Sequence, residues 1–116
     1  MAINKSLTEL FGTGATQTIT DFTIQKASLA SSRTPIAFQA LLALAENTAE
    51  SLFIALLLKC WETQDTSPDA ELAIYGPDVQ LVSLVSDGAP AIFEQYIFSV
   101  RVLTKKNQAM PNPNLV

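Results

Sequence analysis

The feature that most constrains how this chain can fold is a run of apolar residues with helical spacing between residues 49 and 61. Apolar side chains recur three and four positions apart, the spacing that lines one face of a helix. This face consists of Ala49, Leu52, Phe53, Leu56, Leu57, Cys60 and Trp61. Asn47 followed by Glu50 has the form of a capping box, so we predict a helix over residues 48–62. A buried strand is the alternative, because period alone does not separate helix from strand in a short continuous apolar run.

The first 45 residues predict three further elements. Ser6 followed by Glu9 is a capping box, which predicts a short helix over residues 7–11 that ends at the turn-forming Gly12-Thr13-Gly14. Residues 17–29 are rich in Thr and Ile without helical periodicity, which favours a strand. Thr34-Pro35 resembles a helix start, and the nearly continuous apolar stretch 36–45 predicts a buried helix.

After a turn-forming loop at residues 63–69 the apolar period changes to two. We predict short strands over residues 71–75 and 79–86, separated by Gly76-Pro77-Asp78, and a last strand over residues 89–104. Asp87-Gly88 predicts the hairpin turn before this last strand. In the last strand one face carries Ile92, Tyr96, Phe98, Val100 and Val102, and the other carries Gln95, Ser99 and Arg101. This alternation is typical of a half-buried antiparallel strand.

Together these elements predict an α+β fold. A short N-terminal helix and one strand precede two central helices, which are packed on an antiparallel meander of three to four strands. Phe53, Leu56, Leu57 and Cys60 are expected to face Tyr96, Phe98, Val100 and Val102. We expect one globular domain over residues 1–104 and a flexible polar C-terminal tail over residues 105–116, where apolar periodicity is absent. An all-β fold is the alternative.

The residue inventory excludes much of catalytic chemistry. The chain contains no histidine and one cysteine, so Ser-His-Asp and Cys-His nucleophile systems and zinc sites cannot be built within it. Cys60 lies on the apolar helix face and is interpreted as a small core residue. Gly12-x-Gly14 follows a helix and is interpreted as a connector, not a phosphate loop. We therefore expect no catalytic residues, no metal and no cofactor, and hence no enzyme.

Nothing in the sequence predicts a membrane or a secretory destination. The start of the chain has no apolar run of signal-peptide type, and the longest apolar stretch, residues 52–58, is far shorter than a bilayer requires. A single cysteine cannot form a disulfide within the chain. These observations predict a cytoplasmic protein without a membrane partner.

Charge is unevenly distributed along the chain. The acidic residues between positions 60 and 100 are Glu62, Asp65, Asp69, Glu71, Asp78, Asp87 and Glu94, with no basic residue among them. Such a segment repels phosphate, which argues against nucleic-acid binding. Arg101, Lys105 and Lys106 follow at the C-terminal end. Asp78 and Asp87 of one copy could therefore meet this basic end of the next copy, although the acidic segment could equally face solvent.

The composition leads to two functional hypotheses. Only 16% of residues are charged, below the quarter that is usual, so we expect part of the surface to be covered by another chain. The first hypothesis is a non-enzymatic structural or assembly subunit that forms a homo-oligomer, for which subunits of phage-like particles offer an analogy of composition only. The second is a small binding module that holds an apolar ligand or partner between helices and sheet. Phe38, Phe53, Trp61 and Tyr96 are its expected lining.

Overall fold

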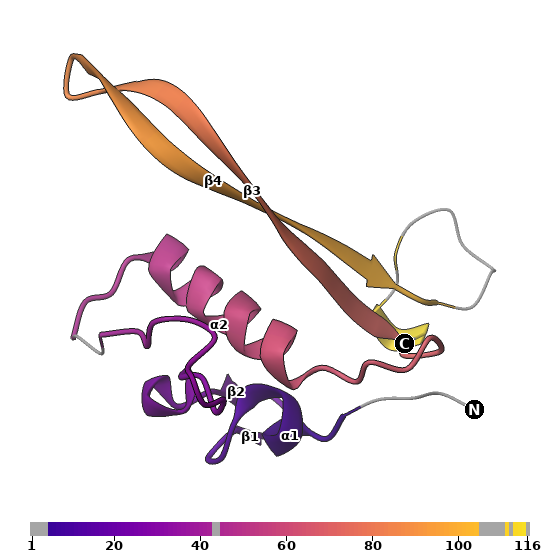
Figure 1. Ribbon diagram of the computed structural model, residues 1–116. Coiled ribbons are helices and arrows are strands. Elements are labelled where there is room, and N and C mark those ends of the chain that lie inside the picture. Colours follow the sequence, from indigo (N-terminus) through magenta and orange to yellow (C-terminus); the bar gives the residue numbers. More distant parts are fainter. Residues whose placement is uncertain (1–4, 43–44, 105–110, 112, 116) are drawn as a thin grey trace.

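The computed structural model describes residues 5–42, 45–104, 111 and 113–115. Its elements are α1 (Leu7–Phe11), β1 (Thr16–Gln17), β2 (Phe22–Thr23), a 3-10 turn η1 (Lys26–Ser28), α2 (Ala49–Thr63), β3 (Leu72–Ser86), β4 (Ala89–Val102) and a second 3-10 turn η2 (Pro113–Leu115). Helix α2 lies between the N-terminal elements on one side and the long β3–β4 hairpin on the other (Figure 1). The mixture of helix and strand agrees with the α+β class and excludes the all-β alternative.

Helix α1 confirms the predicted capping box. The backbone N–H of Glu9 donates to Ser6 Oγ at 3.3 Å, and the backbone N–H of Ser6 donates to Glu9 Oε1 at 3.1 Å. The helix ends at Gly12, whose φ of 98° is open to glycine and strained for other residues. Two backbone donors that a short helix leaves unpaired are therefore satisfied by its own first turn.

Helix α2 settles the choice between helix and strand for residues 49–61. Its N-cap is Thr48 instead of the predicted Asn47, because Thr48 Oγ1 accepts the backbone N–H of Ser51 at 3.1 Å. Asn47 instead accepts a hydrogen bond from Lys26 Nζ at 2.8 Å and donates to the carbonyl of Leu42 at 2.9 Å. The preceding loop is thereby tied to the start of α2.

Two of the predicted N-terminal elements are wrong. Residues 17–29 form a small hairpin and η1 instead of one strand, since the backbone N–H of Asp21 donates to Thr18 Oγ1 at 3.0 Å and closes a turn. The predicted helix over residues 36–45 is also not formed at residues 36–42, and its remaining described residue, 45, lies in a turn. That stretch follows a polar loop, in which Ser31 Oγ accepts the backbone N–H of Ala37 at 2.8 Å.

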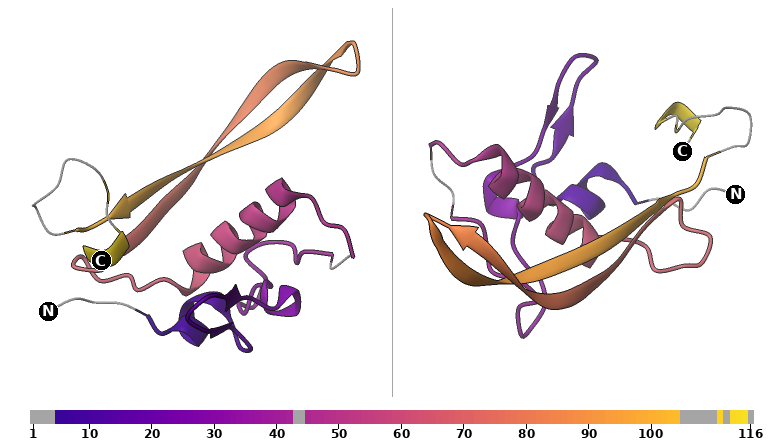
Figure 2. Two further views of the ribbon diagram at one scale, coloured as in Figure 1. Left: turned by 180° about the vertical axis from the view of Figure 1, so that it is seen from behind. Right: turned by 90° about the horizontal axis from the view of Figure 1, so that it is seen from above.

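The C-terminal half is a single two-stranded antiparallel ribbon, not a meander of three or four strands (Figure 2). The predicted strands 71–75 and 79–86 are one continuous strand, β3, and the register runs from Leu72 opposite Val102 to Ser86 opposite Ala89. A bulge between Tyr75 and Asp78 absorbs the Gly-Pro pair that had indicated a turn. The predicted turn at Asp87-Gly88 is confirmed, with φ values of 51° and 78°.

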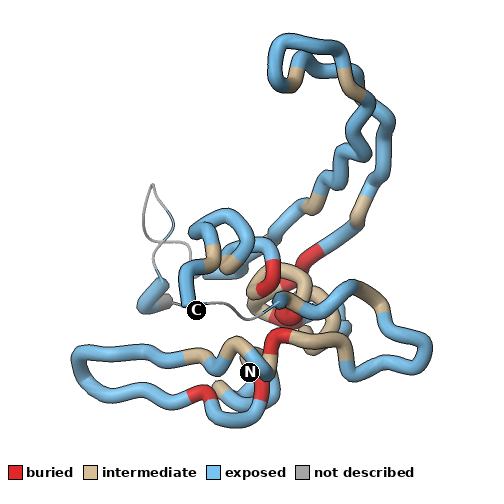
Figure 3. The backbone as a smooth tube through the Cα atoms, turned by 90° about the vertical axis from the view of Figure 1, so that its left-hand side faces the viewer, coloured by how far each residue is buried: buried red, intermediate tan, exposed pale blue. Residues whose placement is uncertain are grey.

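The core of the described residues is small. Its buried apolar residues are Ala15, Leu29, Ala55, Cys60, Ala70, Ala73 and Ile74, and none of the larger side chains is fully buried. They gather around α2 and the base of the hairpin, whereas the rest of the hairpin is mostly exposed (Figure 3). The predicted packing of α2 on the last strand is formed in part: Leu57 lines a cleft with Tyr96 and Phe98, whereas Phe53, Val100 and Val102 are exposed. Trp61, which was not among the residues predicted for this contact, meets the Phe98 ring edge to face at 6.2 Å between centroids.

Of the expected tail, residues 105–110, 112 and 116 lie outside the described residues, and this range includes Lys105 and Lys106. Within the described part of the tail, residues 113–115 form η2.

Candidate assembly surface and apolar cleft

The hairpin beyond the bulge, residues 78–97, presents two apolar faces. Since side chains alternate along a strand and paired residues point the same way, the register assigns each residue to a face. One face, called the cleft face here because its residue Tyr96 lines the apolar cleft described below, carries Val79, Leu81, Ser83, Val85, Pro90, Ile92, Glu94 and Tyr96. The opposite face carries Asp78, Gln80, Val82, Leu84, Ser86, Ala89, Ala91, Phe93, Gln95 and Ile97.

Large apolar side chains on these faces are uncovered. On the cleft face Leu81, Val85 and Ile92 keep 73%, 75% and 76% of their surface exposed. On the opposite face Leu84, Phe93 and Ile97 are also exposed. A sheet with one solvated face normally shows polar residues there, so apolar residues on both faces are typical of strands that are covered on both sides.

An apolar cleft of about 700 Å³ lies where α2, residues 36–39 and the base of the hairpin meet. Its lining is Ile36, Ala37, Phe38, Gln39, Ile54, Leu57, Leu58, Trp61, Pro77, Tyr96 and Phe98. The structure thus brings together three of the four residues expected to line an apolar pocket, namely Phe38, Trp61 and Tyr96. Phe53 is not among them: it lines a separate, shallow depression with Ala49, Glu50 and Ile54, and it is 62% exposed.

Two polar groups stand at the edges of this cleft. The Tyr96 hydroxyl donates to the Glu94 carboxylate, and this hydrogen bond together with the carboxylate charge raises the pKa of Tyr96. The guanidinium of Arg33 lies over the Trp61 ring, 5.4 Å from its centroid, in a cation–π contact. The apolar lining therefore has a negative group on the hairpin beside Tyr96 and a positive group, from the loop at Arg33, over Trp61 of α2.

Of the charged residues predicted to pair between copies, the structure describes Arg101, Asp78 and Asp87. One terminal nitrogen of Arg101 donates to the carbonyls of Pro68 and Ala70, at 3.0 and 3.2 Å. Arg101 therefore binds the loop before β3 of its own chain. Asp78 lies beside the bulge and Asp87 at the far turn of the hairpin. Lys105 and Lys106 lie outside the described residues, and the pairing between copies stays a prediction.

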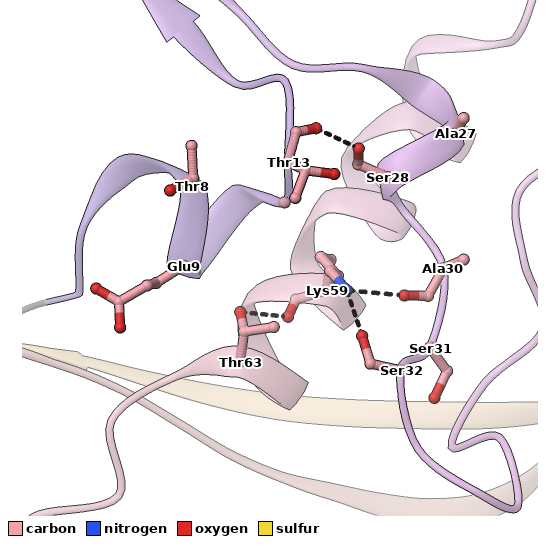
Figure 4. A pocket seen from close by; sticks show the side chains of 11 residues that line it. Thr8, Glu9, Thr13, Ala27, Ser28, Ala30, Ser31, Ser32, Lys59 and Thr63 are labelled. Atoms are coloured by element: carbon pink, nitrogen blue, oxygen red, sulfur yellow. Dashed lines mark hydrogen bonds between the residues drawn. The ribbon is translucent and has the colours of Figure 1, made fainter.

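A polar clamp that the sequence did not reveal holds residues 30–33 against α2 (Figure 4). Lys59, which is buried, donates from Nζ to the Ala30 carbonyl at 2.9 Å and to Ser32 Oγ at 3.1 Å. Glu62 accepts from Ser31 Oγ at 2.5 Å and from the Ser32 backbone N–H at 2.6 Å. Nothing in the apolar run around Lys59 signals that its amine has partners in a loop about 30 residues earlier.

The pKa of Glu62 reflects opposing effects within this clamp. Desolvation by burial is the largest single effect and raises this pKa. The hydrogen bonds from Ser31 and Ser32 and the positive charges of Lys59 and Arg33 together lower the pKa by more, so it lies below its ordinary value. Cys60, which follows Lys59 in α2, is buried as predicted, and burial raises the pKa of its thiol to about 11. A thiol with this pKa is almost entirely protonated at neutral pH and is a poor nucleophile.

The described residues contain no group of three or more carboxylates and thiols placed to hold a metal ion. Among their helices, none is long and apolar enough to span a bilayer. Comparisons of the chain with protein-family models, with curated proteins and with solved structures found no match.

Proposed function

We propose that the protein is a non-enzymatic structural subunit that self-associates, and that residues 78–97 of the hairpin form its association surface. The observation that carries this proposal is the long, apolar and uncovered ribbon formed by β3 and β4. A two-stranded ribbon is marginally stable alone in water and gains stability when a neighbouring chain covers it. The absence of histidine from the sequence supports a role without acid–base catalysis.

The total surface of the chain supports the same proposal. It is 8734 Å², whereas a compact monomer of 12.5 kDa is expected to expose about 6,200 Å². The radius of gyration is 16.7 Å against about 13 Å for a compact domain of this length. The excess of roughly 2,500 Å² is comparable to what one subunit contributes to a large obligate interface.

The test is the mass of the protein in solution, measured by light scattering over a hundredfold range of concentration at low and high salt. We expect a mass above 12.5 kDa that rises with concentration and is not reduced by salt, because the surface is apolar and Arg101 is engaged within its own chain. An interface built on charge pairing would weaken at high salt. A mass of 12.5 kDa at every concentration overturns the proposal.

The apolar cleft supports a second candidate, a site for an apolar ligand. Its volume of about 700 Å³ lies within the range of small-molecule pockets, and four aromatic side chains line it. The test is a titration with the dye 1-anilinonaphthalene-8-sulfonate at protein concentrations where the chain is monomeric. Saturable binding that is weakened by Ala37→Phe, which fills the cleft, supports this candidate, and binding that is unchanged in this variant contradicts it.

A further inference from the structure

The hairpin has two outer edges, and the hydrogen-bond pattern decides which backbone groups they offer. In an antiparallel pair, hydrogen-bonded and non-hydrogen-bonded residue pairs alternate. The two-residue turn at Asp87-Gly88 is closed by the hydrogen-bonded pair Ser86 and Ala89. At the other end, the backbone N–H of Leu103 donates to the Glu71 carbonyl at 2.9 Å, so these two residues form a hydrogen-bonded pair. Counting the alternation from this pair through the bulge identifies the same hydrogen-bonded pairs as counting from the turn.

It follows that the cleft-face residues are the non-hydrogen-bonded pairs of the hairpin, and that their backbone N–H and C=O groups point outward. On the outer edge of β3 these residues are Val79, Leu81, Ser83 and Val85. This edge has a complete series of donors and acceptors and carries no proline and no charge over residues 79–86. Natural proteins usually protect such an edge with lysine, proline or a covering segment.

The outer edge of β4 is less suited to pairing. Pro90 occupies one of its outward positions and has no N–H to donate. Glu94 occupies another, so two β4 edges paired about this residue would bring like charges together. The two edges of the ribbon are therefore chemically different, and only that of β3 is uninterrupted.

We propose that the edge of β3 pairs with the same edge of a second copy, antiparallel and across a two-fold axis at Val82. This inference rests on the proposed self-association and names its contact. The axis places Val79 opposite Val85 of the second copy and Leu81 opposite Ser83 of the second copy, and all four outward residues of each edge form hydrogen-bonded pairs. The edge is thus complementary to itself, which is the requirement for a two-fold interface.

The resulting sheet has four strands, in the order β4, β3, then β3 and β4 of the second copy. The cleft faces of both ribbons join into one apolar face, because antiparallel pairing preserves the side on which paired residues lie. Asp78 is opposite Ser86 of the second copy, so no two charged residues face each other directly. The occupant is a second copy because self-pairing matches every outward donor with an acceptor and leaves the unsuited β4 edge outside.

The first test is a disulfide across the axis. In the proposed register Val82 faces itself in a non-hydrogen-bonded pair, with Cα atoms about 4.5 Å apart, which a disulfide can span. A Val82→Cys variant in a Cys60→Ala background is therefore expected to form a covalent dimer under mild oxidation. The matched control is Gln95→Cys in the same background, since Gln95 lies on the same face but on β4. A dimer that forms as readily from Gln95→Cys overturns the proposal.

The second test removes one outward donor without removing apolar surface. Ser83→Pro loses an N–H that the hairpin itself does not use, as Pro90 already does on β4. We expect at least a tenfold rise in the dimer dissociation constant for Ser83→Pro and less than a twofold change for the control Glu94→Pro, with circular dichroism verifying that both variants fold. Association that is equally weakened by both variants, or by neither, overturns the proposal.

These outcomes separate the edge pairing from the proposed function. If the unmodified chain associates but neither Ser83→Pro nor Val82→Cys reports on the contact, another surface mediates association and only the edge pairing is wrong. If the unmodified chain stays at 12.5 kDa at all concentrations, both proposals are wrong.

Discussion

Gly76 shows how one residue shapes the hairpin. Its φ is 112°, and a Cβ built on it would lie 2.7 Å from the Ile97 carbonyl oxygen, a backbone atom that cannot move aside without disturbing the pairing. Glycine is therefore needed here for two reasons, the backbone conformation and the close approach of β4. The bulge that it permits keeps the two halves of β3 in one strand.

Gly76→Ala is expected to lower the free energy of unfolding by at least about 2 kcal/mol, since the strained φ and the backbone contact add. Gly88→Ala is the matched control, because Gly88 also has a positive φ but no atom within 4 Å of an added Cβ. We expect the control to cost about 1 kcal/mol. Urea unfolding at one protein concentration measures both, and equal losses would show that the contact with Ile97 has no effect.

At Glu62 the lowered pKa gives a pH dependence with a definite sign. The folded state favours the charged carboxylate, so the contribution to stability is complete above the ordinary pKa of 4.5 and is lost as the pH falls through the lowered value. We expect the wild-type chain to lose more stability than Glu62→Gln over this acidic range. Thermal unfolding as a function of pH measures the difference, and parallel curves for the two proteins would contradict the account.

At the scale of elements, one polar side chain ties the end of α2 to the hairpin by hydrogen bonds. Gln64, the C-cap of α2, accepts the backbone N–H of Ile74 at 2.7 Å and donates to its carbonyl at 2.8 Å. The side-chain amide thus makes the two backbone hydrogen bonds that a neighbouring strand would make to Ile74, which is buried. Trp61 against Phe98 provides the adjacent apolar contact.

Gln64→Ala leaves both backbone groups of Ile74 without these partners, and we expect it to lower the free energy of unfolding by about 1–3 kcal/mol. Gln64→Glu keeps the acceptor and loses the donor, so its effect at neutral pH is expected to differ from that of Gln64→Ala. Gln80→Ala, at an exposed position of β3, serves as the control. Urea unfolding tests this ordering, and a loss in the control as large as in Gln64→Ala would contradict it.

The elements that the sequence predicted correctly are those fixed by local interactions. Ser6 and Glu9 cap α1, apolar spacing defines α2, and Asp87-Gly88 forms the turn of the hairpin. One of the errors falls where distant residues decide the structure. Residues 36–42 are apolar enough for a helix, yet the loop before them is held by Lys59 and Glu62 of α2, which no local pattern reveals.

The candidate sites follow the same division. Low charge predicted that another chain covers part of the surface, but not that the hairpin carries the uncovered area, since Gly76-Pro77-Asp78 resembles the end of a strand. Phe38, Trp61 and Tyr96 do meet around one cleft. Phe53 does not, although it shares a helix face with Trp61, since it lies two turns earlier in α2 and lines a separate depression.

At the scale of the whole molecule, the chain has too little core for its apolar content. Apolar residues make up 48% of the sequence, yet most of the buried apolar residues in the described part are alanines. Burial of side chains is the main favourable term in folding. We therefore expect much of the stabilising burial to form between copies, so that stability rises with protein concentration.

The most direct test of this account is amide hydrogen exchange, resolved to single residues and recorded at low and high protein concentration. We expect the outward amides of Val79, Leu81, Ser83 and Val85 to become protected as concentration rises. Those of Ile92, Glu94 and Tyr96 on the outer edge of β4 should stay in fast exchange. Exchange at the four β3 amides that is fast and independent of concentration would contradict the claim that this edge joins two copies.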